Sequence, residues 1–196
     1  MNRGSRKRNP AARAVGGGGV LAVGGGVCWW LSPGGLGQDR PVVVTEGASV
    51  EVYRGLTGTV ADGPGWLGAV LEVATEGTLV VLGVVLLAVW WAALRVGDAR
   101  RVAGTVLVGV GTVVAYGVSE AVKLVVDEER PCRALGAAVR TVAQCPEPGD
   151  WSFPSNHATL AAALAVGLAL VRPALAPLTL PVAVAAALLR VLVGVH

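Results

Sequence analysis

The feature that most constrains this chain is a series of apolar blocks, each about 18 residues long or longer. A helix of that length crosses the roughly 30 Å hydrocarbon core of a bilayer. Hydrophobic residues make up 54% of the 196 residues and charged residues 15%, which leaves too little polar surface for a soluble protein. The sequence therefore predicts an all-α, polytopic transmembrane helix bundle. We expect five spans, over residues 14–31, 77–96, 102–122, 154–171 and 178–195.

The first apolar block has a competing interpretation as a cleavable signal peptide. Its apolar stretch is too long for one, and its exit at residues 29–33 lacks the small residues of a cleavage site. We therefore favour a spanning helix. Two longer polar segments separate the blocks, residues 32–65 and 123–153. We expect the first of them to be a loop that lies partly on the membrane surface.

The distribution of charge predicts the orientation. Residues 1–13 form a basic tail, and no aromatic or Gly-rich RNA-binding pattern accompanies it, so we expect a cytoplasmic anchor and no nucleic-acid partner. With the N-terminus inside, the inner segments hold nine of the 16 Lys and Arg residues but only one acidic residue, Asp98. This predicts a multi-pass protein of the cell membrane with residues 123–153 on the extracytoplasmic face. The nine inner cations are Arg3, Arg6, Lys7, Arg8, Arg13, Arg95, Arg100, Arg101 and Arg172.

The last apolar block ends without a polar tail. Five spans place the C-terminus outside, and we expect a sixth helix to be missing by truncation. Residues 14–196 then form one membrane domain after the basic tail. The sequence does not indicate the oligomeric state.

The three cysteines lack the spacing and the partners of a zinc site, so we expect no metal. Cys28 lies inside the first apolar block. Cys132 and Cys145 share the polar segment 123–153, where an extracytoplasmic position allows a disulfide. Two free thiols are the alternative.

Two cations follow the third apolar block at a spacing of seven residues. On one continuous helix, Lys123 and Arg130 would point the same way, about 10 Å apart along the axis, and could converge on an anion. Pro131 would end or bend that helix. An interfacial basic pair that snorkels, or pairing with the acidic residues 127–129, is the plainer alternative.

The only two histidines, His157 and His196, fall at the same predicted membrane level. Pro154 before an apolar run marks a helix start, so the amides of Ser155, Asn156 and His157 would face an anion. Arg190 and His196 are about 240° apart on a straight helix and share no face. They meet only if the chain relaxes near Gly194.

The motifs Lys123-x6-Arg130-Pro131, Pro154-Ser155-Asn156-His157 and Arg190-x5-His196 together resemble the three ordered signatures of the type 2 phosphatidic acid phosphatase (PAP2) family, which is related to vanadium haloperoxidases. The resemblance covers about residues 77–196. It implies a phosphate cradle without metal or cofactor and two catalytic histidines. His196 would be the nucleophile, and His157 the acid that protonates the leaving oxygen. The cradle would comprise Lys123, Arg130, Ser155, Asn156 through its backbone amide, and Arg190.

Three departures from the family pattern stand out. Asn156 replaces the usual Gly, as in relatives that act on polyprenyl diphosphates, and Leu189 replaces the usual Ser. The Asp that usually follows the nucleophilic His by four residues would lie beyond His196. The resemblance nonetheless implies a membrane enzyme that hydrolyses a lipid phosphate or diphosphate through a phosphohistidine intermediate.

Polyprenyl diphosphate is the favoured substrate, followed by phosphatidic acid or phosphatidylglycerol phosphate. The alternative is a non-catalytic, anion-binding membrane protein, such as a transport or scaffold subunit. A transporter would favour internal repeats, and the sequence shows none. The hydropathy excludes a soluble haloperoxidase.

Overall fold

The computed structural model describes Gly26 and residues 41–196. The basic tail and the first predicted span fall outside these residues, apart from Gly26. The described part is helical, and its only β-type pairing is an isolated bridge between Val42 and Glu128. The α-helices are α2 (Ala48–Ala61), α3 (Gly65–Arg95), α4 (Ala99–Val126), α5 (Pro131–Ala134), α6 (Asn156–Val171) and α7 (Ala176–Leu192), and the 3-10 helices are η1 (Gly136–Ala138) and η2 (Pro173–Leu175).

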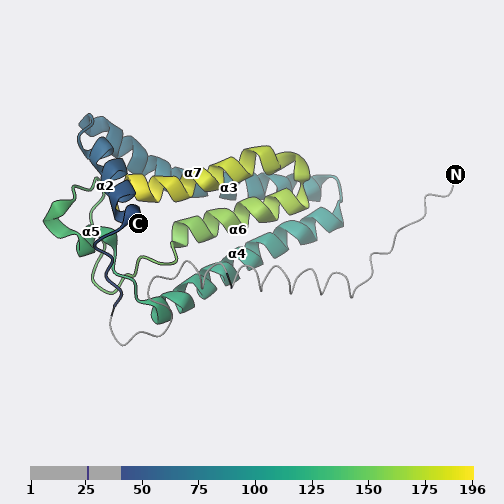
Figure 1. Cartoon of the computed structure of the whole chain (residues 1–196). Coiled ribbons are helices and arrows are strands. Elements are labelled where there is room, and N and C mark those ends of the chain that lie inside the picture. The colour runs from purple at the N-terminus through teal and green to yellow at the C-terminus, as the bar shows by residue number, and fades with distance from the viewer. Residues whose placement is uncertain (1–25, 27–40) are drawn as a thin grey trace.

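Four helices, α3, α4, α6 and α7, lie side by side and run alternately up and down (Figure 1). Helix α6 packs against the other three. Its buried face carries the small residues Ala161 and Ala165, which let neighbouring backbones approach closely. The described core is completed by Leu82 and Val89 of α3, Leu168 of α6 and Ala186 of α7.

Large apolar side chains cover the outside of this bundle, for example Val84, Leu107 and Leu188, each more than half exposed. A water-soluble bundle would not expose so many. The helices α3, α4 and Pro173–Leu192 are long and apolar enough to cross a membrane, whereas α6 is apolar but only 16 residues long. The prediction of an all-α membrane bundle is confirmed.

Buried hydroxyl groups satisfy their hydrogen-bonding capacity within the helices. Thr75 and Thr112 each donate to the carbonyl four residues earlier, at 2.8 Å. Thr179 of α7 also donates to the Ala165 carbonyl of α6 at 3.3 Å, which joins two helices. Such local bonds let polar residues sit in an apolar interior at little cost.

Several predicted boundaries were wrong. Helix α3 begins at Gly65 rather than residue 77, because the acidic residues Glu72 and Glu76 in its first turns do not interrupt the helix. Within the predicted loop 32–65, residues 48–61 form α2, since Val50, Tyr53, Thr57 and Val60 recur every three or four residues and bury one face. Helix α7 ends at Leu192 rather than residue 195.

The two ends of the bundle differ. We call one the turn end: it consists of the short connections 96–98 and 172–175 (Figure 1). The other, the site end, carries α2, the long segment 127–155 and the C-terminal residues 193–196. A disulfide between Cys132 and Cys145, with Cα atoms 5.9 Å apart, closes the long segment at the site end.

Candidate active site

Lys123 and Arg130, which we call the cation pair, lie at the site end and are almost fully buried, with 5% and 3% of their surfaces exposed. They do not share a helix, so the prediction of a common helical face was wrong. Helix α4 ends at Val126, and Asp127 adopts a left-handed conformation (φ 44°) that redirects the chain. Pro131 begins α5 rather than ending a longer helix.

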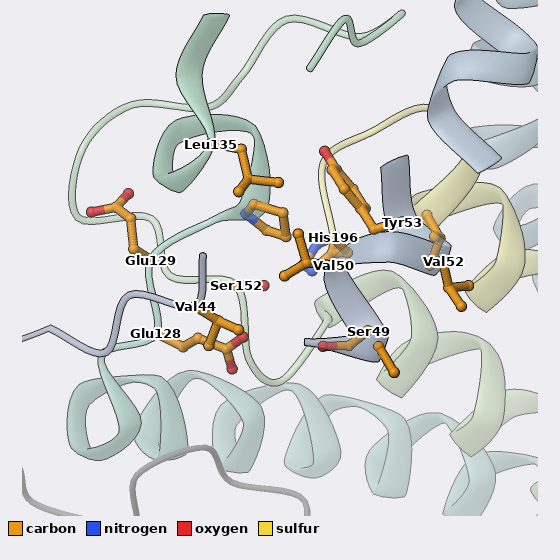
Figure 2. Close-up of a pocket in the computed structure, with 13 residues that line it drawn as sticks. Val44, Ser49, Val50, Val52, Tyr53, Glu128, Glu129, Leu135, Ser152 and His196 are labelled. Atoms are coloured by element: carbon orange, nitrogen blue, oxygen red, sulfur yellow. The ribbon is translucent and has the colours of Figure 1, made fainter. Parts of the chain in front are cut away.

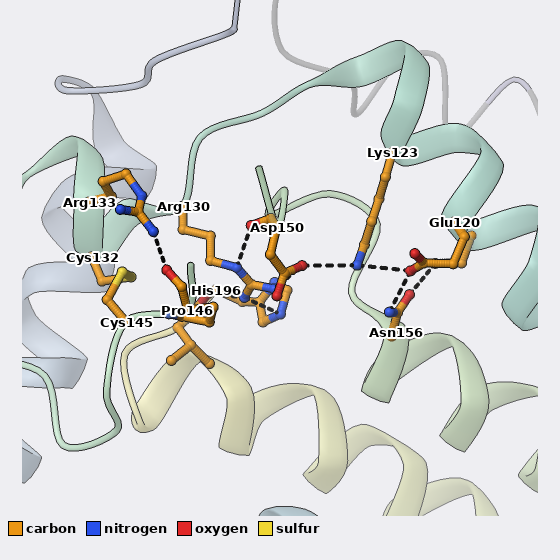
Figure 3. Close-up of polar contacts among 12 residues, drawn as sticks. Glu120, Lys123, Arg130, Cys132, Arg133, Cys145, Pro146, Asp150, Asn156 and His196 are labelled. Carbon is orange, nitrogen blue, oxygen red and sulfur yellow. Dashed lines mark hydrogen bonds and ion pairs between the residues drawn. A yellow bond between two sulfur atoms is a disulfide. The ribbon is translucent and has the colours of Figure 1, made fainter. Parts of the chain in front are cut away.

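The cation pair nevertheless converges, on the carboxylate of Asp150 (Figure 3). Arg130 Nη2 lies 3.0 Å from Asp150 Oδ1, and Lys123 Nζ lies 3.4 Å from the same oxygen. Arg130 Nε also donates to the Asp150 backbone carbonyl at 2.8 Å. Burial alone would raise the pKa of Asp150, but the hydrogen bonds and charges of Arg130 and Lys123 outweigh it and lower that pKa. An anion therefore already sits between the two cations.

Arg130 also reaches the end of the chain. Its Nη1 donates to the Val195 carbonyl at 2.8 Å and lies 3.0 Å from His196 Nε2. A guanidinium only donates, so Nε2 offers its lone pair and the ring proton resides on Nδ1. His196 is thus held as a neutral imidazole whose Nε2 points at the cation pair.

The pKa of His196 agrees with this tautomer. Burial and, after it, the charges of Arg130 and Arg190 lower that pKa to about 3, against the opposing effect of a backbone hydrogen bond with Ser152. The ring is therefore unprotonated at neutral pH. An unprotonated imidazole is the form that can act as a nucleophile.

The position of His196 depends on the turn that precedes it. Helix α7 stops at Leu192, and Gly194 takes a left-handed φ of 89° that only Gly adopts readily. Tyr53 of α2 donates its hydroxyl to the Gly194 carbonyl at 2.7 Å. The relaxation near Gly194 on which the sequence interpretation depended is present.

Arg190 lies in the last turn of α7, close enough for its charge to act on His196. Its Nε is buried and has no hydrogen-bond partner within the described part of the chain. A buried guanidinium nitrogen without a partner is unfavourable and is suited to receive an anionic oxygen.

Helix α6 presents its N-terminus to the site end. Ser155 is the N-cap, and its Oγ accepts from the Ala158 amide at 3.5 Å. The helix begins at Asn156, so Pro154 is not the first helical residue that the sequence predicted. The leading amides of α6 are those of Asn156 and His157, at the positive end of the helix dipole.

Sequence reasoning missed what the Asn156 side chain does. Its Nδ2 donates to Glu120 Oε1 at 2.7 Å, and Ser119 donates to its Oδ1 at 2.9 Å. Glu120 is also 3.1 Å from Lys123 Nζ (Figure 3). The Gly usual in the family pattern has no side chain to make these bonds, so Asn156 ties the start of α6 to α4 and, through Glu120, to Lys123.

His157 lies apart from this network. Its Nε2 is 2.9 Å from Glu76 Oε1 of α3. Among the described contacts, none joins His157 to His196 or to the cation pair. The structure thus brings Lys123, Arg130 and His196 into one network with Arg190 beside it, and holds His157 against α3.

A cavity of about 510 Å³ opens beside His196 (Figure 2). Its walls are mainly apolar and include Val44 and Val50 near α2 and Leu135 after α5. Glu128 also lines it, and burial raises the pKa of this carboxyl to about 7. The site thus combines an anion cradle, a neutral imidazole and an apolar cavity in which a non-polar group next to phosphate would fit.

Comparison with known families agrees with the motifs. Residues 104–196 match the model of the PAP2 superfamily, and the match includes all three signature motifs. No curated protein and no solved structure matches the chain significantly. This similarity supports a phosphatase-type function. Residues 104–196 are thus similar to the PAP2 superfamily, which is consistent with a PAP2 family phosphatase.

Proposed function

We propose that this protein is a membrane phosphatase that hydrolyses a lipid phosphate or diphosphate. The observation that carries the proposal is the double role of Arg130, whose guanidinium holds an anion together with Lys123 and contacts His196 Nε2 at 3.0 Å. A phosphoryl group in the place of that anion would lie next to a neutral imidazole.

In the first step, Nε2 of His196 attacks phosphorus. The N–P bond forms while the bond between phosphorus and the lipid-side oxygen breaks, and the departing oxygen takes a proton. Arg130, Lys123 and Arg190 stabilise the negative charge on the equatorial oxygens, a role that metal ions have in other phosphoryl transfers. For this step Arg130 Nη1 must turn from Nε2 to a phosphate oxygen.

In the second step, water attacks the phosphohistidine. The N–P bond breaks, inorganic phosphate leaves, and His196 returns to its neutral form. We assign His157 as the acid for the departing oxygen and as the base for this water. Glu76 supports the assignment because its carboxylate, 2.9 Å from Nε2, can accept a hydrogen bond from the imidazole and orient the ring.

Polyprenyl diphosphate remains the favoured substrate, and phosphatidic acid or phosphatidylglycerol phosphate comes next. Asn156 at the usual Gly position and the apolar cavity beside His196 support a substrate with an apolar chain. We also propose that the site end faces the extracytoplasmic side. The arginines Arg95, Arg100, Arg101 and Arg172 at the turn end and the disulfide at the site end support this orientation.

The test is phosphate release from a panel of lipid phosphates by the purified protein in proteoliposomes. We expect release in the wild type, none with His196→Ala, and inhibition by vanadate, whose trigonal-bipyramidal form can bond to Nε2. A short-chain substrate supplied only outside intact cells should also be hydrolysed, and failure there would contradict the proposed orientation.

The control is a substitution at the other end of the bundle, Arg172→Lys, which should leave turnover unchanged. Turnover by His196→Ala at the wild-type rate would overturn the mechanism. Phosphate binding without turnover on any lipid would favour the alternative, a non-catalytic anion-binding membrane protein.

A further inference from the structure

Asp150 contacts both members of the cation pair, although the signature motifs do not include it. We propose that its carboxylate occupies the place of the substrate phosphate between Lys123 and Arg130, and that the substrate must displace it to bind. The proposal rests on the proposed function, because it takes the cation pair as the phosphate cradle.

The contacts of Asp150 are those expected of a bound anion. A single carboxylate oxygen lies 3.0 Å from Arg130 Nη2 and 3.4 Å from Lys123 Nζ. Both cations are almost fully buried. Lys123 Nζ also lies 3.1 Å from Glu120 Oε1, but Asp150 is the carboxylate that contacts Arg130 in the described part of the chain, and a buried cation without an anion is strongly unfavourable. Carboxylate and phosphate oxygens are recognised by Arg in the same way. Asp150 therefore stabilises the substrate-free cradle by the same interactions that phosphate would use.

The carboxylate can leave without disturbing its surroundings. The Asp150 side chain is 44% exposed, unlike the cations it contacts. It lies in a turn where its amide donates to the Glu147 carbonyl at 3.2 Å and where Gly149 has a φ of 90°.

Two attachments hold the turn on either side. The Cys132–Cys145 disulfide lies before it, and after it the Ser152 amide donates to the Glu128 carbonyl at 2.8 Å.

The backbone of Asp150 makes a separate contact that need not break. Arg130 Nε donates to the Asp150 carbonyl oxygen, not to the carboxylate. Rotation of the side chain would free Arg130 Nη2 and would leave Lys123 Nζ in contact with Glu120, while Arg130 Nε still fixes the guanidinium plane (Figure 3). Removing the carboxylate should thus empty the cradle and keep Arg130 oriented.

This arrangement has a measurable consequence. If a ligand binds only when Asp150 is displaced, its apparent association constant is the intrinsic one multiplied by the fraction of molecules in which the cradle is open. A purely structural Asp150 predicts the reverse, since its loss would disorder the cation pair and weaken anion binding.

The experiment is isothermal titration calorimetry of inorganic phosphate with the purified protein in detergent. The variants are Asp150→Asn, which removes the charge and keeps the shape, and Glu147→Gln, which removes an exposed charge of the same turn. We expect Asp150→Asn to bind phosphate about tenfold more tightly than wild type. Glu147→Gln should bind like wild type. Equal or weaker binding by Asp150→Asn would overturn the proposal.

A second measurement uses the wild type and does not depend on whether the variant folds. Carbodiimide labelling of the Asp150 carboxyl, followed by peptide mass spectrometry, should increase several-fold when saturating phosphate is added. Labelling of Glu147 should not change. Unchanged labelling of Asp150 would contradict displacement.

The two proposals fail differently. If wild type releases phosphate from lipids but neither measurement responds as expected, Asp150 is not displaced and the proposed function stands. If neither wild type nor Asp150→Asn binds phosphate and no lipid is hydrolysed, both proposals are wrong.

Discussion

The two ends of the bundle differ in how they connect the helices: the turn end uses short local turns, and the site end uses long segments. At the turn end, α3 passes into α4 through residues 96–98, and α6 passes into α7 through residues 172–175. The turn end therefore needs little more than Gly97 in a left-handed conformation and Asp98, whose carboxylate accepts from the Arg101 amide at 3.0 Å.

At the site end, segments that are distant in sequence bind one another. Tyr53 contacts Gly194, and Val42 pairs with Glu128. Arg130 contacts Asp150, Val195 and His196. Helix packing orders the bundle, whereas the proposed chemistry depends on non-local polar contacts at the site end. Substitutions at the two ends should accordingly affect different properties.

The largest expected difference is between two arginines. Arg130→Lys keeps the charge but removes the planar fork that contacts Asp150, Val195 and His196 together. We expect phosphatase activity to fall by about 100-fold or more, the range for loss of an oxyanion-stabilising donor. Arg172→Lys at the turn end should stay close to wild type. Steady-state rates on the best lipid substrate measure both, and equal losses would refute the division between the ends.

Two left-handed glycines provide the second comparison. A Cβ at Gly194 would lie 2.6 Å from Thr141 Cγ2, in addition to the unfavourable φ of 89°, whereas a Cβ at Gly97 meets nothing within 4 Å. We expect Gly97→Ala to cost about 1 kcal/mol of stability, from the backbone alone. Gly194→Ala should cost up to about 3 kcal/mol.

Thermal unfolding in detergent compares the two glycine variants. Gly194→Ala should also reduce activity, because Gly194 sets the position of His196, and Gly97→Ala should not. A Gly97→Ala protein that is the less stable of the two would contradict this account.

The smallest expected effect depends on pH and is confined to the site end. Burial raises the pKa of Glu128 from 4.5 to about 7. The folded protein therefore holds this proton more tightly, and the stability it contributes is full below pH 4.5 and is lost as pH rises through 7. Glu128→Gln should thus be more stable than wild type above pH 7, with the difference vanishing near pH 4.5. Melting temperatures across this range check it, with Glu147→Gln as the control.

Sequence could predict the elements that follow from local patterns. Apolar length located α3, α4, α6 and α7, although their ends shifted. The spacing of the motifs selected Lys123, Arg130 and His196, which the structure joins in one network. The prediction that Lys123 and Arg130 share a helix was wrong because Asp127 ends the helix in a left-handed conformation. The pattern of apolar residues does not indicate a single left-handed residue.

The remaining parts of the site come from long-range contacts. Asp150, Glu76 and Tyr53 act through partners 20 to 141 residues away, and nothing in their neighbouring residues indicates such partners. The acidic residue Asp150, just before the second motif, was a usable signal, since buried cations require an anion. Helix α2 was detectable from its spacing, but the polar residues around it suggested a loop.

The hydrogen bond from the Tyr53 hydroxyl to the Gly194 carbonyl determines how much of this protein must be kept in a truncated or chimaeric version. The signature motifs all lie within residues 104–196, so a minimal fragment or a chimaera would naturally be drawn around that region. Such a fragment would keep each motif residue and lose Tyr53, Glu76 and the whole of α3. Its histidines would be present, but the contact of Glu76 with His157 and the hydrogen bond of Tyr53 to Gly194 would be lost. The smallest fragment that keeps the whole site therefore begins before α2.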